Sequence, residues 1–374
     1  MAKFIVPEKI ITDPGSLSQL PGIVQSMGIS RVMLVTGRSW ARESGYLGKI
    51  IHNLGSVGVV AKVFEGVPEE PSCCVIDQIR ESIKANDSQL VIGLGGGSAM
   101  DAAKAGAILV YSDKSTVWHL YSQQLPNKSL PTFAIPTTAG TGSEATPVSV
   151  LTDEEKKVKM SIRTDAMMPR AAIVDPELTI TCSPGLTAIT GMDALVQAIE
   201  SFCSRYSTHL SDAITEKAIS LISKNIVEAY RDGTNMNARQ AMSEGSLMAG
   251  MALANVRLGA VHGLAHPLGG KYGIPHGLVC AVLMPVILEF NKPELYSGKE
   301  DKYSLLCNIL MADPVIYVRN LLTQLDLPQN LHEYKIKEED LDVLADQSMT
   351  SGSTKANPRE VTKDDFLEML RKVM

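Results

Sequence analysis

The chain has 374 residues, of which 45% are hydrophobic and 20% are charged, and its formal net charge is −6. This length predicts two domains or one large domain, and the composition is ordinary for a globular protein. No basic run marks a surface for nucleic acid, which excludes a nucleic-acid partner.

Targeting and membrane signals are weak. The first ten residues, MAKFIVPEKI, contain no apolar core of signal-peptide length. The longest apolar stretch, residues 281–290, is too short to span a bilayer. Six cysteines without a C-x-x-C pair indicate reduced, mostly buried thiols. We therefore expect a cytoplasmic protein with no membrane partner.

The first half of the chain alternates strand and helix signals. Short apolar runs that end in glycine-rich loops predict strands, and apolar residues at helical spacing predict helices. The predicted strands lie in residues 31–36, 57–64, 89–97 and 132–142, and the predicted helices are 72–85 and 98–111. Strand, loop and helix in this order predict a parallel α/β sheet.

Beyond about residue 183 the strand signals nearly vanish. Helical periodicity continues through residues 185–204, 210–230, 238–256 and 276–291. The stretch TCSPG (181–185) separates the two patterns. We predict an α/β domain over residues 1–182 and an all-helical domain over residues 183–374.

Two glycine-rich loops in the first domain have the character of a nucleotide site. GLGGGSAMDAAK (93–104) follows a predicted strand and opens a helix, whose N-terminal N–H groups favour phosphate. Its spacing is neither the Rossmann fingerprint nor a P-loop, so on this stretch alone a tight turn without ligand is an equal alternative. PTTAGTGSEAT (136–146) ends another predicted strand, where ligands of open α/β sheets bind. Together the loops indicate nucleotide binding.

The second domain contains a carboxylate and an amide on one helix face. In GMDALVQAIE (191–200), Asp193 and Gln197 lie one turn apart among apolar residues. A buried carboxylate has to be paired or to bind a metal. This helix is therefore a candidate source of two oxygen ligands.

Three of the seven histidines fall within 15 residues. His262 and His266 lie one helical turn apart, and His276 starts the next predicted helix. A lone histidine in apolar surroundings is usually a core residue, but three this close favour a site. Two imidazoles with the oxygens of Asp193 and Gln197 suit Zn²⁺ or Fe²⁺. The third histidine would lie just outside the metal, either as a proton relay or as a group that contacts a metal ligand.

Four motifs together resemble the iron-containing (group III) alcohol dehydrogenases over essentially the full length. They are GGGSAMDAAK, IPTTAGTGSEAT, GMDALVQAIE and VHGLAHPLGGKYGIPHG. The resemblance implies a parallel-sheet dinucleotide-binding domain followed by a helical metal-binding domain, with the active site between them. It also implies NAD or NADP as cofactor, a divalent metal (Fe²⁺ or Zn²⁺), and interconversion of a small aldehyde and its alcohol, by a homodimer.

Site residues follow from the resemblance motif by motif. The implied metal ligands are Asp193, His262, His276 and the residue at 197, and His266 matches the family's histidine near the metal and nicotinamide. The implied cofactor residues are Gly95, Gly96, Gly97 and Ser98 at the pyrophosphate, Asp101 supporting that loop, Thr137, Thr138, Thr141 and Ser143 along the rest, and Lys159 near the ribose.

Position 197 departs from the family, which usually carries histidine there. One interpretation is loss of the metal, as in the related metal-independent maleylacetate reductases. The other, which we favour, keeps the metal, because Asp193, His262 and His276 remain and an amide oxygen coordinates. Replacing nitrogen by a harder oxygen predicts weaker or altered metal binding.

Arg257 is a second departure, five residues before His262, where relatives often carry a small or uncharged residue. A surface arginine at a helix end is an equal alternative. The functional hypothesis is that its guanidinium binds an anionic substrate, such as a two- to four-carbon aldehyde bearing a sulfonate, phosphonate or carboxylate.

The cofactor preference stays open in the sequence. After the first strand, Gly37 stands where NAD-specific relatives often place an acidic residue for the ribose 2′-OH. Arg38 and Ser39 would accept a 2′-phosphate, so both NADH and NADPH are allowed.

Two rival functions remain beside the metal-dependent and metal-independent reductases. A lyase or cyclase of the dehydroquinate synthase type shares the fold and cofactor, but Met-rich helices argue against its polar, basic substrate site. A non-catalytic nucleotide-binding protein would follow from decay of the metal site at Gln197.

Overall fold

The computed structural model describes residues 3–156, 158–298 and 300–374. The chain divides into two compact units, Met1–Ile180 and Thr181–Met374. This division falls two residues from the boundary that we expect from the sequence.

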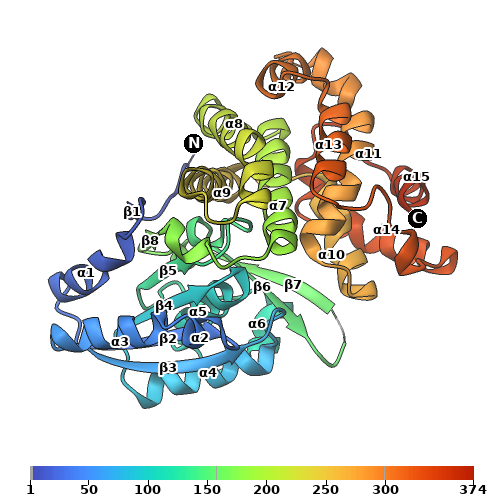
Figure 1. Ribbon diagram of the computed structural model, residues 1–374. Coiled ribbons are helices and arrows are strands. Elements are labelled where there is room, and N and C mark those ends of the chain that lie inside the picture. Colours follow the sequence, from blue (N-terminus) through green and yellow to red (C-terminus); the bar gives the residue numbers. More distant parts are fainter. Residues whose placement is uncertain (1–2, 157, 299) are drawn as a thin grey trace. The chain divides into compact units, whose positions relative to one another are not determined.

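A six-stranded parallel sheet organises the first unit. Its order is β1-β8-β5-β4-β2-β3, and in Figure 1 the strands follow one another in this sequence from β3 at the bottom to β1. The strands are β1 (Lys9–Ile11), β2 (Arg31–Gly37), β3 (Val60–Val67), β4 (Leu90–Gly95), β5 (Thr132–Pro136) and β8 (Ala171–Ile173). The predicted parallel α/β sheet is confirmed.

Helices cover both faces of this sheet, because alternate strand residues point in opposite directions. Val32 and Leu34 of β2 pack with one set of helices, and Met33 and Val35 pack with the other. The first set is α1 (Leu20–Ser26), α2 (Trp40–Glu43) and α3 (Tyr46–Ser56), and the second is α4 (Cys73–Ala85), α5 (Gly97–Leu109) and α6 (Thr116–Ser122).

The sequence did not predict one element of this unit. Strands β6 (Val148–Asp153) and β7 (Val158–Arg163) form an antiparallel hairpin outside the main sheet. Alternation of buried and partly buried residues along β6 is typical of such a strand. The predicted strand at 57–64 is also shifted, since β3 begins at Val60 and continues to Val67.

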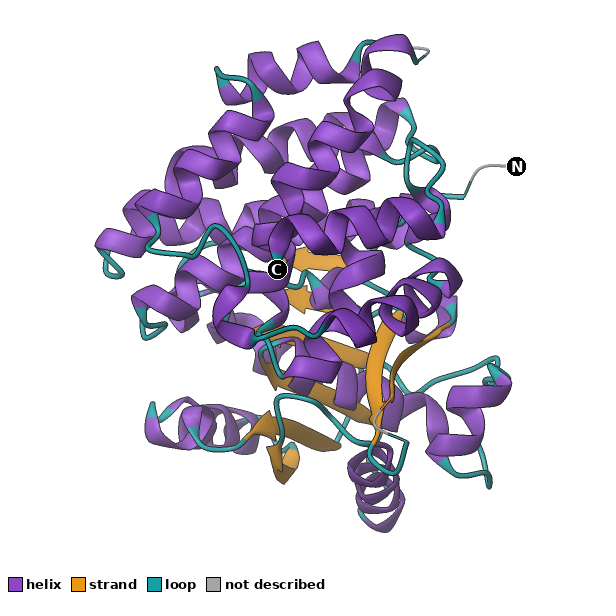
Figure 2. Ribbon diagram, turned by 90° about the vertical axis from the view of Figure 1, so that its right-hand side faces the viewer, coloured by secondary structure: helices purple, strands orange, loops and turns teal. Residues whose placement is uncertain are grey.

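The second unit is helical throughout its described residues, and the strands of Figure 2 all belong to the first unit. Ser183 caps the first long helix, where its Oγ accepts a hydrogen bond from the Leu186 N–H (3.2 Å). The helices are α7 (Pro184–Cys203), α8 (His209–Arg231), α9 (Met236–Val256), α10 (Ala260–Tyr272), α11 (His276–Ser297), α12 (Lys302–Leu310), α13 (Pro314–Gln324), α14 (Leu341–Thr350) and α15 (Lys363–Val373). The predicted all-helical character is confirmed.

Residues 302–324 pass a membrane-span test by length and composition alone. They form two helices, α12 and α13, that pack against α11. At the start of α12, Lys302 pairs with Asp212 of α8 at 2.9 Å. The helix pair α9 and α10 passes the same test only if its 103° bend is ignored. Such apolarity is also typical of core helices.

Candidate functional site

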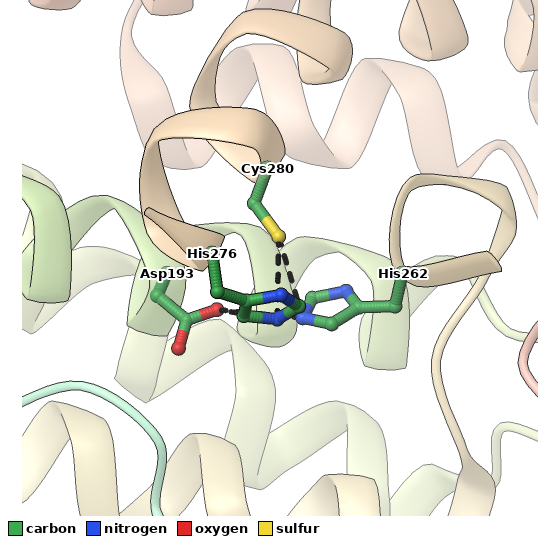
Figure 3. A group of neighbouring side chains, drawn as sticks. All are labelled: Asp193, His262, His276 and Cys280. Atoms are coloured by element: carbon green, nitrogen blue, oxygen red, sulfur yellow. Dashed lines mark hydrogen bonds and ion pairs between the residues drawn. The ribbon is translucent and has the colours of Figure 1, made fainter. Parts of the chain in front are cut away.

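The metal-site side chains come from three helices of the second unit. Asp193 projects from the middle of α7, His262 from the first turn of α10, and His276 from the first residue of α11. Asp193 Oδ1 lies 3.4 Å from His262 Nε2 and 3.8 Å from His276 Nε2 (Figure 3). A fourth side chain, Cys280, lies one turn along α11 from His276, and the four ligand atoms are within 4.8 Å of one another.

Close helix packing brings these residues together. A Cβ added at Gly277 would lie only 2.2 Å from the Ile189 carbonyl oxygen of α7. Only a glycine therefore allows the start of α11 to approach α7 this closely. That approach places His276 beside Asp193.

Glu200 orients His262. Its Oε2 lies 2.6 Å from His262 Nδ1, and its Oε1 accepts the Val261 N–H at 2.7 Å. Burial opposes protonation of His262, but Cys280, Asp193 and Glu200 outweigh this effect and raise its pKa well above the usual value. Because Nδ1 is engaged by Glu200, Nε2 is the nitrogen that faces Asp193 and Cys280.

Two buried oxygens at the site have no hydrogen-bond donor among the described residues. They are Asp193 Oδ1 and Gln197 Oε1, on residues that are each 4% exposed. Burial alone would raise the pKa of Asp193, but contacts with His262, His276 and Gln197 hold it below the usual value. A divalent cation would satisfy Asp193 Oδ1, and Gln197 Oε1 is a further candidate ligand, so the side chains present fit a metal.

His266 lies beside the cluster. Its ring stacks on the His276 ring, with centroids 4.9 Å apart and planes 16° apart. The His262 ring centroid is farther away, at 6.4 Å. His266 is partly exposed, whereas His262 is buried. This position suits a group that exchanges protons with solvent.

The predicted cofactor loops meet at the carboxyl ends of the parallel strands. Gly95 ends β4 with φ of 152°, and its carbonyl accepts the Thr137 N–H at 3.0 Å. A Cβ on Gly95 would come within 2.8 Å of Ala99 Cβ, and one on Gly97 within 2.8 Å of Thr141 Cγ2. The glycines leave open a space beside the backbone that side chains would fill. A pyrophosphate could approach the backbone closely there.

The other predicted residues of this region surround the same loops. A Cβ on Gly95 would lie 3.9 Å from the Gly37 nitrogen, and one on Gly96 would lie 3.7 Å from Thr138 Oγ1. Arg38 and Ser39 follow Gly37 and are exposed.

Two further predicted residues contact the segment after β3. Ser98 donates a hydrogen bond to the Glu69 carbonyl, and Lys159 pairs with Glu70 at 3.1 Å. The ends of β2, β3, β4 and β5 thus gather the predicted cofactor residues at one edge of the sheet.

Asp101 and Ser143 lie in a buried network rather than on an open surface. Ser143 Oγ donates to Asp101 Oδ1 and accepts from the Lys104 ammonium at 2.7 Å. Lys104 also pairs with Asp101 at 3.0 Å, and Asp101 Oδ2 accepts the Val150 N–H. Burial lowers the pKa of Lys104. The network ties the two loops together, and the Ser143 hydroxyl is used inside it.

Arg257 ends α9 in a backbone conformation that favours glycine, with φ of 63° and ψ of −175°. Its side chain is exposed, and its Nη1 would lie 3.1 Å from a Cβ on Gly352. Its carbonyl is 3.4 Å from Ser201 Oγ, next to Glu200. Among the described residues, no carboxylate lies within ion-pair distance of this guanidinium.

Three residues of these clusters escaped the sequence prediction. Glu200 follows Asp193 by seven residues, so helical spacing places both on one face. Cys280 follows His276 by four, which is the same signal. Lys104 ends the GGGSAMDAAK motif, but its burial was not evident.

Comparison with known proteins identifies the class. Residues 7–176 match the family "Iron-containing alcohol dehydrogenase", and residues 187–374 match "Fe-containing alcohol dehydrogenase family, C-terminal". The chain belongs to this family and is an alcohol or aldehyde oxidoreductase. Like the family, it uses NAD(P) and a divalent metal.

Individual relatives cover the whole chain. "Alcohol dehydrogenase 4" of Saccharomyces cerevisiae is 33% identical, over 99% of this chain and 97% of its own length. "Sulfoacetaldehyde reductase" of Bilophila wadsworthia is 33% identical, over 97% and 96%. A solved structure of sulfoacetaldehyde reductase from Bifidobacterium kashiwanohense in complex with NAD⁺ superposes with a TM-score of 0.92 at 31% identity, covering 100% of this chain and 98% of that one.

Proposed function

We propose that this protein is a metal-dependent NAD(P)H oxidoreductase that reduces a small anionic aldehyde of two to four carbons to its primary alcohol. The observation that supports the reaction class most directly is the cluster of the buried Asp193 and His262 with the partly exposed His276. Within it, Asp193 Oδ1 and the neighbouring Gln197 Oε1 have no hydrogen-bond donor among the described residues. In the proposal Asp193, His262 and His276 hold the metal, and Gln197 Oε1 is the candidate for a fourth position.

The chain's own residues would divide the work as follows. When bound, the metal polarises the substrate oxygen and NAD(P)H supplies the hydride. Glu200 holds His262 in one orientation, and the glycine cradle at 95–97 positions the cofactor pyrophosphate. His266 delivers the proton that the product oxygen takes up. The balanced reaction consumes one aldehyde, one NAD(P)H and one proton.

The backbone conformation and the charge of Arg257 are the reasons for proposing an anionic substrate. A non-glycine residue at φ 63°, ψ −175° costs on the order of 1–3 kcal/mol, and such strain concentrates at functional sites. The exposed guanidinium has no carboxylate partner among residues 3–156, 158–298 and 300–374. Two relatives carry the name sulfoacetaldehyde reductase, which is consistent with a sulfonate or carboxylate on the substrate.

The test is steady-state kinetics on Arg257→Gly, which also relieves the backbone strain. We expect kcat/KM for sulfoacetaldehyde to fall by about 10- to 100-fold, the effect of one charge-assisted hydrogen bond, while propanal reduction is unchanged. Equal losses for both aldehydes would contradict the anionic substrate. The assays use NADH and NADPH, since Gly37 leaves both open.

The proposal also places the enzyme in the cytoplasm as a homodimer. None of the six cysteines forms a disulfide among the described residues, which is consistent with a reducing compartment. Light scattering on the purified protein tests the dimer, and a monomer mass would contradict it.

A further inference from the structure

The Cys280 thiol lies among the metal-site side chains and has no part in the function described so far. Its Sγ is 3.7 Å from His262 Nε2 and 3.6 Å from His276 Nε2 (Figure 3). Cys280 is fully buried, and it shares a helix face with His276 one turn earlier. The sulfur is therefore as close to the two imidazoles as the Asp193 carboxylate is.

The four N–O and N–S distances between these atoms fit one shared ion. Around tetrahedral Zn²⁺, with metal–N and metal–O of about 2.0 Å and metal–S of about 2.3 Å, N–O pairs lie ~3.3 Å apart and N–S pairs ~3.5 Å apart. The observed N–O distances are 3.4 and 3.8 Å, and the N–S distances are 3.7 and 3.6 Å. Each of these four distances is within about half an ångström of the tetrahedral value.

A second observation points independently to a cation at this place. Asp193 is 4% exposed, and its Oδ1 accepts no hydrogen bond from the described residues although it faces both imidazoles. A buried carboxylate oxygen needs a positive partner, and a bound cation would supply that charge directly in place of a protonated imidazole. The thiol and the unsatisfied oxygen border the same space.

We propose that the Cys280 thiolate is a protein ligand of the metal, together with Asp193, His262 and His276. This inference rests on the proposed function, because it requires the metal to bind there. The thiol proton passes to solvent as the metal–sulfur bond forms. Cys280 then replaces Gln197 as the fourth protein ligand. The ligand count stays at four, and a fifth position remains for the substrate oxygen.

A thiolate changes which metals the site selects. Sulfur is a softer ligand than an amide oxygen and favours Zn²⁺ over Mg²⁺ and Mn²⁺. The ligand set would thus offset the missing histidine at position 197. We expect zinc affinity to depend strongly on Cys280 and weakly on Gln197.

The test uses Co²⁺ as a spectroscopic probe on the chelator-stripped, reduced full-length protein. A thiolate bound to Co²⁺ gives an intense near-ultraviolet charge-transfer band that nitrogen and oxygen ligands do not give. We expect this band in the wild-type protein, in Gln197→Ala and in the control Cys307→Ser. Cys280→Ser should keep the visible Co²⁺ absorption and lose the near-ultraviolet band.

Zinc competition with a chelator gives a second readout that does not depend on activity. Cys280→Ser should bind Zn²⁺ more weakly, by on the order of 100-fold, and Cys307→Ser should equal the wild type. If Cys280→Ser does not fold, the near-ultraviolet band of the wild-type protein alone tests whether the thiolate binds the metal.

Each adverse result has a distinct meaning. Stoichiometric Co²⁺ binding by the wild type without the near-ultraviolet band would overturn the thiolate ligand and leave the proposed function intact. A band that persists in Cys280→Ser would also overturn it. A wild-type protein that binds neither Co²⁺ nor Zn²⁺ would overturn both proposals.

Discussion

At the scale of single residues, one carboxylate decides how His262 is presented. Glu200 engages Nδ1 at 2.6 Å, so Nε2 points toward Asp193. Carboxylate partners of this kind fix the ring orientation and raise the basicity of the coordinating nitrogen. The spacing of Asp193 and Glu200 is visible in the sequence. The contact with His262 is not, because nothing in the chain relates α7 to residues 259–262.

Glu200→Gln tests this role. The amide keeps an oxygen for the Val261 N–H but removes the negative charge beside His262. We expect Zn²⁺ affinity, measured by chelator competition, to fall by about 10- to 100-fold. The exposed Glu216→Gln on α8 is the matched control. Equal zinc affinity in both variants would show that Glu200 does not support the site.

A second residue, Glu144 in the predicted cofactor loop 136–146, makes the stability of the protein depend on pH. Burial raises the pKa of Glu144 from 4.5 to about 7, although nearby Lys104 lowers it. The folded protein thus binds the Glu144 proton more tightly than the unfolded chain does. This proton stabilises the folded state fully below pH 4.5, and the stabilisation is lost as pH rises through about 7.

Glu144→Gln removes this titration. From about pH 4.5 to about pH 8, the variant should gain up to about 3 kcal/mol of unfolding free energy relative to the wild type. Denaturant unfolding at several pH values measures the difference, with the exposed Glu155→Gln as control. A difference that stays constant across this range would contradict the raised pKa.

At the scale of elements, helices α7, α10 and α11 form the candidate metal site by their close approach. Periodicity predicted α7 and α11 well, because long apolar faces dominate both. It did not predict the β6–β7 hairpin, whose short strands lack a continuous apolar run. The contact between α7 and α11 depends on the absence of one side chain, which no periodic pattern reports.

Gly277→Ala tests that contact. Its Cβ would meet the Ile189 carbonyl at 2.2 Å, so α11 has to move away from α7. We expect a loss of about 1–3 kcal/mol in unfolding free energy and weaker Zn²⁺ binding, because His276 moves with the helix. Gly270→Ala on α10 is the control, since nothing lies within 4 Å of its added Cβ. An equally stable Gly277→Ala would contradict the close approach.

At the scale of the whole molecule, each unit contains a different candidate site. The first gathers the predicted nucleotide-binding loops at the carboxyl ends of its strands, and the second gathers candidate metal ligands from distant parts of the helical chain. Sequence patterns predicted the α/β and helical character of the two units, and the candidate site residues stay predictions. They did not predict the strand order or the inclusion of Cys280, because both depend on contacts between segments far apart in the chain.

The most direct test measures metal content by mass spectrometry on protein purified without chelator, with NADH and NADPH oxidation assayed on the same sample. The account predicts a near-stoichiometric divalent metal, and aldehyde reduction that chelator abolishes and Zn²⁺ or Fe²⁺ restores. Full activity in metal-free protein would contradict it and would assign the chain to the metal-independent reductases.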